Sequence, residues 1–306
     1  MKISIVLIIG RRVCRAQAIV DSVQYQKGIT DAELIIIDCF NTCSQVSFRS
    51  GLDYTIINER IAGYGKLRKI GIDKARGEYV AFVEEHTIVE PNWLNETLKT
   101  FDDHDCDGVG GAMITMNDQF NISQVLGIIN FLKFHPPVNS MASDSLPGYN
   151  NAFRKEVINQ LDEYLLEYEP ILYWELQKRG CHLMINPAIR FQHAFENDWK
   201  LSFRVSKIYN QCFASFRKKY YRWGIAKLIF RILAVPLMPF SRTAKDLFYI
   251  IRFKKPLLSL ALKRIHLIFF LHSAASLGSL CGYFSGYQGL REKFTLIELD
   301  LERPLG

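Results

Sequence analysis

The chain has 306 residues, of which 49% are hydrophobic, and it carries a formal net charge of +7. This length predicts one large core with an appendage rather than three domains. The seven cysteines are odd in number and never form a Cys-x-x-Cys pair, which indicates reduced thiols and argues against a disulfide framework or a zinc site. The apolar run ending at Ile9 is too short for a signal peptide. We therefore expect the active part of the protein to stay in the cytosol.

The charge is distributed unevenly along the chain. Between Trp199 and Arg264 there are sixteen Lys and Arg residues and one acid, Asp246, a net charge of +15, so the rest of the chain carries −8. In this basic region cations alternate with aromatic and aliphatic residues, a mixture that suits an anionic membrane surface. A solvated basic helical bundle and a site for single-stranded nucleic acid are the alternatives.

The N-terminal part alternates strands and helices. Ile3 to Ile9 and Glu33 to Asp38 are predicted to be buried strands, and the apolar residues between them have helical spacing, which gives a βαβ unit. Tyr54 to Ile57 is a third strand. The pattern predicts an α/β fold, in which ligands bind beyond the carboxyl ends of the strands. Asp38 lies at such an end, although an Asp in this position is also a common turn former.

A basic helix is predicted from Gly63 to Arg76, with Gly77 as the left-handed residue that closes it. An apolar strand from Tyr79 to Val83 follows and leads into Glu84-Glu85-His86. A strand that is apolar at every position is buried on both faces. The pattern places cations before a buried strand and acids just after it, so we expect a charged cleft there.

This order of motifs resembles that of family 2 glycosyltransferases. The features that carry the resemblance are Arg68 in the helix, the run Ala75-Arg-Gly-Glu-Tyr79, and Glu84-Glu-His86 at the place of the family's aspartate-x-aspartate motif. The resemblance covers roughly residues 2 to 195. It implies a GT-A (Rossmann-like) fold and an inverting transfer of a sugar from a nucleotide-diphosphate sugar to a hydroxyl acceptor. The donor-binding residues expected from it are Asp38, Lys66, Arg68, Glu84 and Glu85.

A divalent metal is expected at the end of this strand. Glu84 and His86 can both be metal ligands, and their i, i+2 spacing places them on one side of an extended segment. A carboxylate and a neutral imidazole are softer than magnesium prefers, so we expect manganese rather than magnesium. His193 closes a segment, Pro187 to His193, that resembles the family's P-x-A-x-V-x-H, where the His commonly approaches the metal. An exposed acidic loop that caps the next helix is the alternative.

The resemblance also positions the catalytic base. Counting back from Gly180, the family's Glu-Asp pair falls at Tyr168 and Glu169, so Glu169 is the base by position and Glu167 is its rival. Inversion needs a carboxylate that takes the proton of the acceptor hydroxyl. Pro170 is compatible with a helix that starts there, and we expect the dipole of that helix to keep Glu169 ionised. A capping Glu without a catalytic role is the alternative.

Three further residues are assigned to the acceptor and sugar side. Gly111 belongs to a glycine-rich strand that permits close backbone approach. Asn151 and Arg154 belong to a segment that resembles the family's N-x-A-x-R-R motif at the floor of the site. The segment from Asn117 to Ser145 is predicted to be irregular and to line the acceptor side.

The C-terminal part is predicted to meet a membrane. Residues 265–290 are uncharged and long enough to span a bilayer, but they contain several polar residues and glycines. Residues 225–240 are interrupted by cations and prolines and suit the interface. We predict a GT-A domain over residues 1–196 and a helical membrane-associating tail over residues 197–306. A monotopic anchor on the cytoplasmic face is favoured, with one crossing or a re-entrant hairpin at 265–287 as the alternative.

The expected acceptor is a lipid-linked or growing saccharide, because a membrane anchor would hold the site close to one. Nucleic acid is not an expected partner. Two other functions remain open at this stage. A noncatalytic, glycosyltransferase-like protein that binds a nucleotide sugar would explain the atypical Glu-Glu-His motif, and a basic nucleic-acid-binding protein would explain the tail alone.

Overall fold

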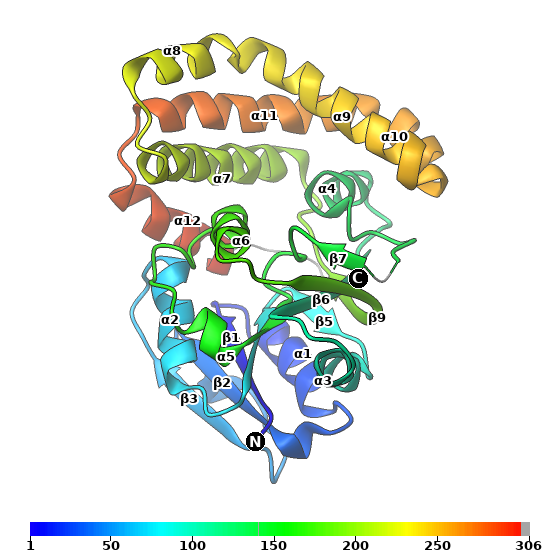
Figure 1. Ribbon diagram of the computed structural model, residues 1–306, viewed down its shortest axis with the longest axis vertical. Coiled ribbons are helices and arrows are strands. Elements are labelled where there is room, and N and C mark those ends of the chain that lie inside the picture. Colours follow the sequence, from blue (N-terminus) through cyan, green and yellow to red (C-terminus); the bar gives the residue numbers. More distant parts are fainter. Residues whose placement is uncertain (140, 301–306) are drawn as a thin grey trace.

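A nine-stranded mixed sheet forms the core of the computed structural model, which describes residues 1–139 and 141–300 (Figure 1). The strand order is β3-β2-β1-β4-β8-β6-β9-β5, and β7 pairs with β9. Strands β1 to β4 are mutually parallel, and β8 runs antiparallel to both β4 and β6. The strands are β1 (Ile3–Ile9), β2 (Ala32–Asp38), β3 (Tyr54–Asn58), β4 (Tyr79–Glu84), β5 (Thr87–Val89), β6 (Gly108–Thr115), β7 (Met141–Ser143), β8 (Asn151–Arg154) and β9 (Leu183–His193).

The first strands form where apolar runs predict them. Every residue of β1 and of β2 is buried, as expected for parallel strands that are covered on both faces. Between them lies α1 (Val13–Gln24), whose buried residues recur at helical spacing. The predicted α/β fold and its first βαβ unit are therefore confirmed.

Helix α2 (Tyr64–Lys74) packs on β1 and β2, but Gly77 does not close it. The helix ends at Lys74, and Gly77 is not among the glycines with positive φ, so the predicted left-handed conformation is wrong. Gly77 is instead a point of close approach, because a Cβ there would lie 2.6 Å from the backbone nitrogen of Ser4. Its N–H also donates a hydrogen bond to the Ser4 hydroxyl.

The prediction that the segment from Asn117 to Ser145 is irregular is wrong. The segment contains α4 (Asn121–Phe131), whose buried residues include Ile122, Val125 and Leu126 at helical spacing. The remaining helices of this half are α3 (Trp93–Asp103), α5 (Lys155–Ile158) and α6 (Glu169–Lys178), with short 3-10 turns at Ile29–Asp31 and Thr42–Gln45.

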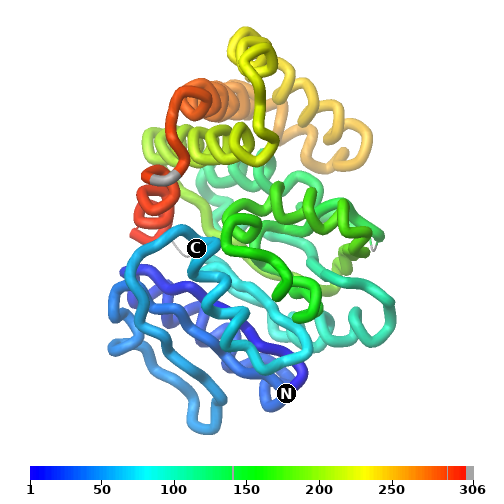
Figure 2. Tube along the Cα trace, turned by 60° about the vertical axis from the view of Figure 1, so that its left-hand side comes forward, coloured from blue at the N-terminus to red at the C-terminus, as the bar shows by residue number. Residues whose placement is uncertain are grey.

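The C-terminal helices form layers on one side of the sheet (Figure 1). Helix α11 lies between α7 and α9, while α8, α9 and α10 form the layer farthest from the sheet. Helix α12 turns back and contacts both α7 and α2, and Figure 2 shows it beside the N-terminal part of the chain. These helices are α7 (Trp199–Tyr220), α8 (Ile225–Leu233), α9 (Met238–Phe253), α10 (Leu258–Lys263), α11 (Ile265–Phe284) and α12 (Gln288–Asp300), with 3-10 turns at Val235–Leu237 and Lys255–Leu257.

Helix α11 is the one helix of the described residues that is long and apolar enough to cross a membrane. However, 56% of its apolar window is buried inside the protein, where it packs against α7 and α9. Length and composition alone do not distinguish a span from a core helix.

Candidate active site

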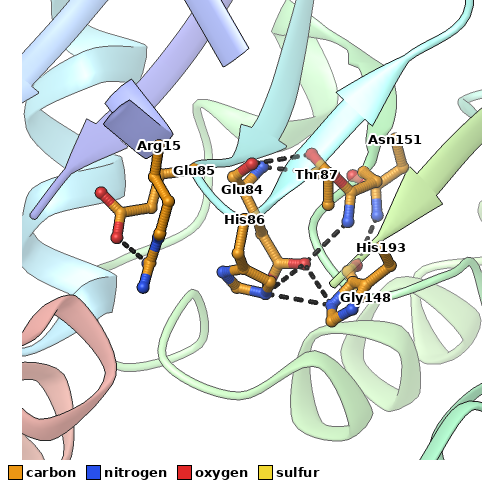
Figure 3. A network of polar contacts seen from close by, with 9 residues as sticks. Arg15, Glu84, Glu85, His86, Thr87, Gly148, Asn151 and His193 are labelled. Atoms are coloured by element: carbon orange, nitrogen blue, oxygen red, sulfur yellow. Dashed lines mark hydrogen bonds and ion pairs between the residues drawn. The ribbon is translucent and has the colours of Figure 1, made fainter. Parts of the chain in front are cut away.

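Glu84, His86 and His193 meet at the carboxyl end of β4 (Figure 3). Glu84 is the last residue of β4, and pairing of Thr87 on β5 with His193 on β9 brings the two histidines together. The Nε2 atoms of the histidines are 3.0 Å apart. Oε2 of Glu84 lies 3.8 Å from Nε2 of His86 and 3.7 Å from Nε2 of His193. The residues that the sequence analysis named as metal ligands thus converge.

The geometry of this cluster fits a divalent metal ion. Metal bonds of about 2.0–2.2 Å place neighbouring ligand atoms about 3 Å apart, close to the spacing found here. Burial raises the pKa of Glu84, but hydrogen bonding and the charge of His193, the charge of Arg68 and a hydrogen bond from Asn150 outweigh it and lower the pKa overall. The carboxylate is therefore kept in the ionised form that a metal requires.

Asn150, which the sequence analysis missed, fixes the orientation of Glu84. Its Nδ2 donates to Oε2 of Glu84 at 2.7 Å, and its Oδ1 accepts from the backbone N–H of Glu84 at 3.2 Å and from the Thr87 hydroxyl at 3.0 Å. Asn151, which was predicted to face the sugar, instead donates to the carbonyl oxygen of Gly148 and to the Tyr173 hydroxyl. Neighbouring residues in extended chain point to opposite sides, so only one of the two asparagines can reach the carboxylate.

Glu169 is the first residue of α6, and Pro170 lies in the first turn, as predicted. The Tyr209 hydroxyl on α7 lies 3.3 Å from Oε2 of Glu169 and donates a hydrogen bond to it. Desolvation raises the pKa of Glu169. The positive charge of Arg68 lowers this pKa, and the negative charge of Glu84 raises it further. The pKa of Glu169 is thus raised although the residue lies at the N-terminus of α6.

Glu167, the rival, supports a neighbouring helix. Its side chain is buried, and Oε2 accepts the backbone N–H of Gly65 in the first turn of α2 at 2.9 Å. Desolvation raises the pKa of Glu167, while the Gly65 hydrogen bond and the charges of Arg68 and Arg291 oppose the shift. The carboxylate therefore satisfies a free N–H at the start of α2, and Glu167 also lines the cavity that contains Glu169.

Arg68 is buried near both glutamates. Its guanidinium carbon lies 3.1 Å from the centre of the Tyr149 ring, and Nη1 donates to the carbonyl oxygen of Leu166 at 2.8 Å. The Tyr149 hydroxyl donates to the same carbonyl at 2.6 Å. Stacking and hydrogen bonding thus hold a fixed cation beside the acidic cluster.

Asp38 folds a loop that does not line the cavity of the metal-ligand cluster, whereas Glu85 does line it. The carboxylate of Asp38 accepts backbone N–H groups of Phe40, Thr42 and Cys43, which folds the turn after β2. The carboxylate of Glu85 contacts the backbone N–H of Gly10 and the guanidinium of Arg15 (Figure 3). Arg15 was not predicted, although an Arg among the apolar positions of α1 was its signal in the sequence.

Five predicted site residues do not line the cavity that contains the metal-ligand cluster: Asp38, Lys66, Gly111, Asn151 and Arg154. Lys66 is exposed on α2. A Cβ on Gly111 would lie 1.7 Å from the carbonyl oxygen of Ile189, so that glycine permits close packing of β6 on β9 rather than on a sugar. Arg154 pairs with Tyr79 at the start of β4, the end opposite to Glu84, and donates to the carbonyl oxygen of Cys106.

A cavity of about 720 Å³ joins these groups. Glu84, His86, His193, Arg68 and Glu169 all line it. Helices α7, α9, α11 and α12 contribute to its wall as well, so the C-terminal helices complete the site rather than form a separate appendage. Their lining residues are Val205, Ser206, Tyr209, Asn210, Arg242, Leu271, His272, Ala275, Phe294, Glu298 and Leu299.

Comparison with protein families identifies the chain. The sequence model of the family described as Glycosyl transferase family 2 matches residues 4–161, slightly more than half of the chain. The chain belongs to glycosyl transferase family 2. It is therefore a glycosyltransferase, and the resemblance drawn from the motifs is confirmed. No curated protein sequence matches this glycosyltransferase.

Solved structures establish the fold. The mannosyltransferase PcManGT from Pyrobaculum calidifontis, in complex with GDP-Man and Mn²⁺, aligns over 91% of this glycosyltransferase and 87% of its own chain, with a TM-score of 0.62 and 14% identity. S. aureus TarS 1–349, in complex with UDP, aligns over 93% of this chain and 91% of its own chain, with a TM-score of 0.46 and 13% identity. A longer S. aureus TarS structure aligns with this chain with a TM-score of 0.45 and 14% identity. The alignment covers 89% of this chain and 55% of the TarS chain, so this chain spans about half the length of that TarS structure. The likeness to PcManGT confirms the predicted GT-A fold.

Proposed function

We propose that this family 2 glycosyltransferase is an inverting enzyme that transfers a sugar from a nucleotide-diphosphate sugar to a hydroxyl acceptor. One observation carries the proposal: a single cavity contains a metal-ligand cluster, a fixed cation and a carboxylate with a raised pKa. Glu84, His86 and His193 form the cluster, Arg68 is the cation and Glu169 is the base. These groups supply what departure of a diphosphate and attack by a hydroxyl require.

On the donor side, Arg68 stabilises the negative charge that develops on the leaving diphosphate. The Tyr149 ring and the Leu166 carbonyl hold its guanidinium in place. Glu84, His86 and His193 would hold a divalent ion, which neutralises diphosphate charge when bound. Two imidazoles and one carboxylate suit manganese better than magnesium, which prefers oxygen ligands. The presence of Mn²⁺ with GDP-Man in PcManGT supports this choice.

On the acceptor side, Glu169 takes the proton of the attacking hydroxyl. The acceptor oxygen then forms its bond to the anomeric carbon on the face opposite to the leaving diphosphate, which inverts that centre. The hydrogen bond from Tyr209 holds the carboxylate in the cavity. Since Tyr209 belongs to α7, the C-terminal helices take part in positioning the base.

We further propose that the enzyme lies on the cytoplasmic face of a membrane and that its acceptor is a lipid-linked or growing saccharide. Support comes from α8, which has no buried residue, and from the outer surface of α9. Large apolar side chains there are 54–79% exposed: Ile225, Phe230, Leu233, Leu237, Phe240, Phe248, Ile251 and Phe253. Exposed cations, including Lys227, Lys245 and Arg252, lie among them. An apolar surface with interspersed cations matches anionic head groups over hydrocarbon.

Hydrolysis and transfer assays with a panel of nucleotide sugars and Mn²⁺ test the proposal. We expect one sugar donor to be consumed, with inverted configuration in the product. A donor that binds without any consumption, with or without acceptors, would support the noncatalytic alternative. Binding to single-stranded nucleic acid without flotation on anionic liposomes would support the nucleic-acid alternative.

A further inference from the structure

The cavity extends beyond the base to a wall formed by three C-terminal helices. The polar residues of this wall are Ser206 and Asn210 on α7, Arg242 on α9 and His272 on α11. Nη1 of Arg242 lies 3.4 Å from Oδ1 of Asn210, and Nδ2 of Asn210 donates to the carbonyl oxygen of Ser206. Asn210 is therefore held so that its oxygen orients the guanidinium.

Arg242 has no carboxylate in direct contact among the described residues, although the charge of Asp246, one turn further along α9, acts on it. Among residues 1–139 and 141–300, no carboxylate lies within 4.0 Å of its guanidinium nitrogens, and the Asn210 contact is its one hydrogen bond. Asp246 lies 2.8 Å from Nε2 of His272. Burial lowers the pKa of Arg242, because the cavity wall removes water from the guanidinium. A half-buried cation that has no anion in contact is stabilised when an anionic ligand binds next to it.

This cation is separate from the donor side of the site. Arg68, the other Arg of the cavity wall, is engaged by Tyr149 and Leu166. The carboxylates that line the cavity belong to the sheet side, to the loops and to α6 and α12, and none of the described lining residues on α7, α9 or α11 is acidic. Among the described lining residues, the carboxylates therefore lie outside α7, α9 and α11, and Arg242 is the one Lys or Arg that these three helices contribute.

We propose that Arg242, positioned by Asn210, forms an anion subsite that binds a phosphate or carboxylate group of the acceptor. The inference rests on the proposed transferase function and narrows its substrate class to anionic acceptors. Helix α9 presents Arg242 to the cavity and Phe240 and Phe248 to the outside. One helix therefore contributes to both the acceptor subsite and the proposed membrane surface. A phosphate of a lipid carrier and a carboxylate of an acidic sugar share the required chemistry.

Three probes with the same alkyl chain separate these sources: octyl phosphate, octyl glucuronide and the neutral octyl glucoside. Their affinities for the full chain are measured by calorimetry with chelator present, so that no metal competes for the anion. We expect one of the anionic probes to bind at least tenfold more tightly than octyl glucoside. A preference for octyl phosphate indicates a lipid phosphate, and a preference for octyl glucuronide indicates an acidic sugar.

Arg242→Gln should reduce the affinity for the anionic probe to that for octyl glucoside. Arg204→Gln is the matched control, because Arg204 is exposed on α7 and does not line the cavity, and it should bind like the wild type. Equal affinity of the wild type for neutral and anionic probes, or full affinity in a folded Arg242→Gln protein, overturns the inference. If Arg242→Gln does not fold, Arg242→Lys replaces it, since losing the forked N–H groups should weaken binding at least threefold. Unchanged affinity in that variant likewise overturns the inference.

Donor consumption is measured separately, because it distinguishes a failure of the anion subsite from a failure of the proposed transferase function. Loss of the anion subsite with intact donor hydrolysis removes only the acceptor assignment. Anion binding at Arg242 without any donor hydrolysis or transfer contradicts the proposed function and leaves the subsite in place.

Discussion

At the scale of single residues, Glu167 and Glu169 are two positions apart but have different surroundings. Glu169→Gln should lower transfer by ~10²- to 10⁴-fold, because the amide cannot accept the hydroxyl proton. Donor affinity should stay nearly unchanged, since the substitution hardly alters volume. Steady-state transfer and calorimetric donor binding measure the two effects. Glu167→Gln is the control, and full turnover in Glu169→Gln together with loss of turnover in Glu167→Gln would transfer the role to Glu167.

The pH dependence of transfer offers a second test of Glu169. Desolvation raises its pKa above the ordinary value of 4.5, and a base works only when it is deprotonated. The rate should therefore rise with pH, with a midpoint above 4.5, and Glu169→Gln should remove this rise. A profile of kcat against pH measures it. A midpoint at or below 4.5 would contradict the raised pKa.

The proposed metal site takes three side chains from two segments. His193→Gln should weaken Mn²⁺ binding by at least about ten- to a hundredfold, because even the loss of a supporting contact costs that much in metal sites. Calorimetric titration of Mn²⁺ and of the donor, with and without chelator, measures the effect. His104→Gln is the control, since His104 is exposed and outside the cluster. Equal donor affinity with and without chelator would mean that Arg68 neutralises the diphosphate alone.

The sequence predicted the residues of this site better than their contacts. Glu84, His86 and His193 followed from their places in motifs, and they do converge. The contact of Asn150 with Glu84 could not be predicted from the sequence, because the choice between Asn150 and Asn151 depends on which side of an extended segment faces β4. The place of Arg154 could not be predicted either, since the antiparallel pairing of β8 carries this residue to the far end of the strand. Such facts depend on tertiary pairing and not on local pattern.

At the scale of secondary structure, Gly77 shows how a glycine is required without positive φ. Gly77→Ala should lower the free energy of unfolding by about 1–3 kcal/mol, because its Cβ would overlap the backbone of Ile3 and Ser4. Urea unfolding measures this change. Gly286→Ala is the matched control, because no atom lies within 4 Å of a Cβ placed there. Equal stability of the two variants would show that β1 moves away at little cost.

Apolar runs predicted the buried parallel strands to within a residue or two, because covered strands carry an unbroken apolar signal. The same reasoning missed α4, where the following Pro136-Pro137 suggested irregular chain. Gly127 faces Thr115 so closely that its Cβ would lie 2.3 Å from that hydroxyl oxygen. It therefore serves helix packing on β6, which sequence pattern alone does not reveal.

At the scale of the whole molecule, the basic C-terminal region has two faces. Its inner face closes the cavity through Tyr209 and Arg242. Its outer face exposes the apolar side chains of α8 and α9, helices that Figure 1 shows in the layer farthest from the sheet. The uneven charge along the sequence pointed to such a region, but its contribution to the cavity could not be predicted. That contribution depends on helices more than thirty residues after Glu169 packing against α6.

The membrane proposal makes a prediction that tests the contribution of α8. If α8 enters the interface, replacing Ile225, Phe230 and Leu233 by Ser should lower partitioning to anionic liposomes by at least about 100-fold, or about 2.7 kcal/mol. Burying each such side chain contributes roughly 1.5–3 kcal/mol, so three losses exceed that threshold. Tyr25→Ser, at an exposed aromatic residue of the N-terminal part, is the control. Flotation of the full chain at low and high salt measures partitioning.

High salt should release the wild type only in part, because salt screens the cations of the outer layer and leaves their apolar neighbours unaffected. The triple variant should be released more completely, since it has lost the apolar contribution of α8. If the triple variant instead floats like the wild type, α8 is not the anchor, and the exposed apolar side chains of α9 or the apolar helix α11 hold the membrane, because the three substitutions leave both untouched. If the wild type does not float at all, the exposed surface of α8 and α9 binds another partner. The comparison therefore separates anchoring by α8 from anchoring by the rest of the apolar surface, and both from a protein partner.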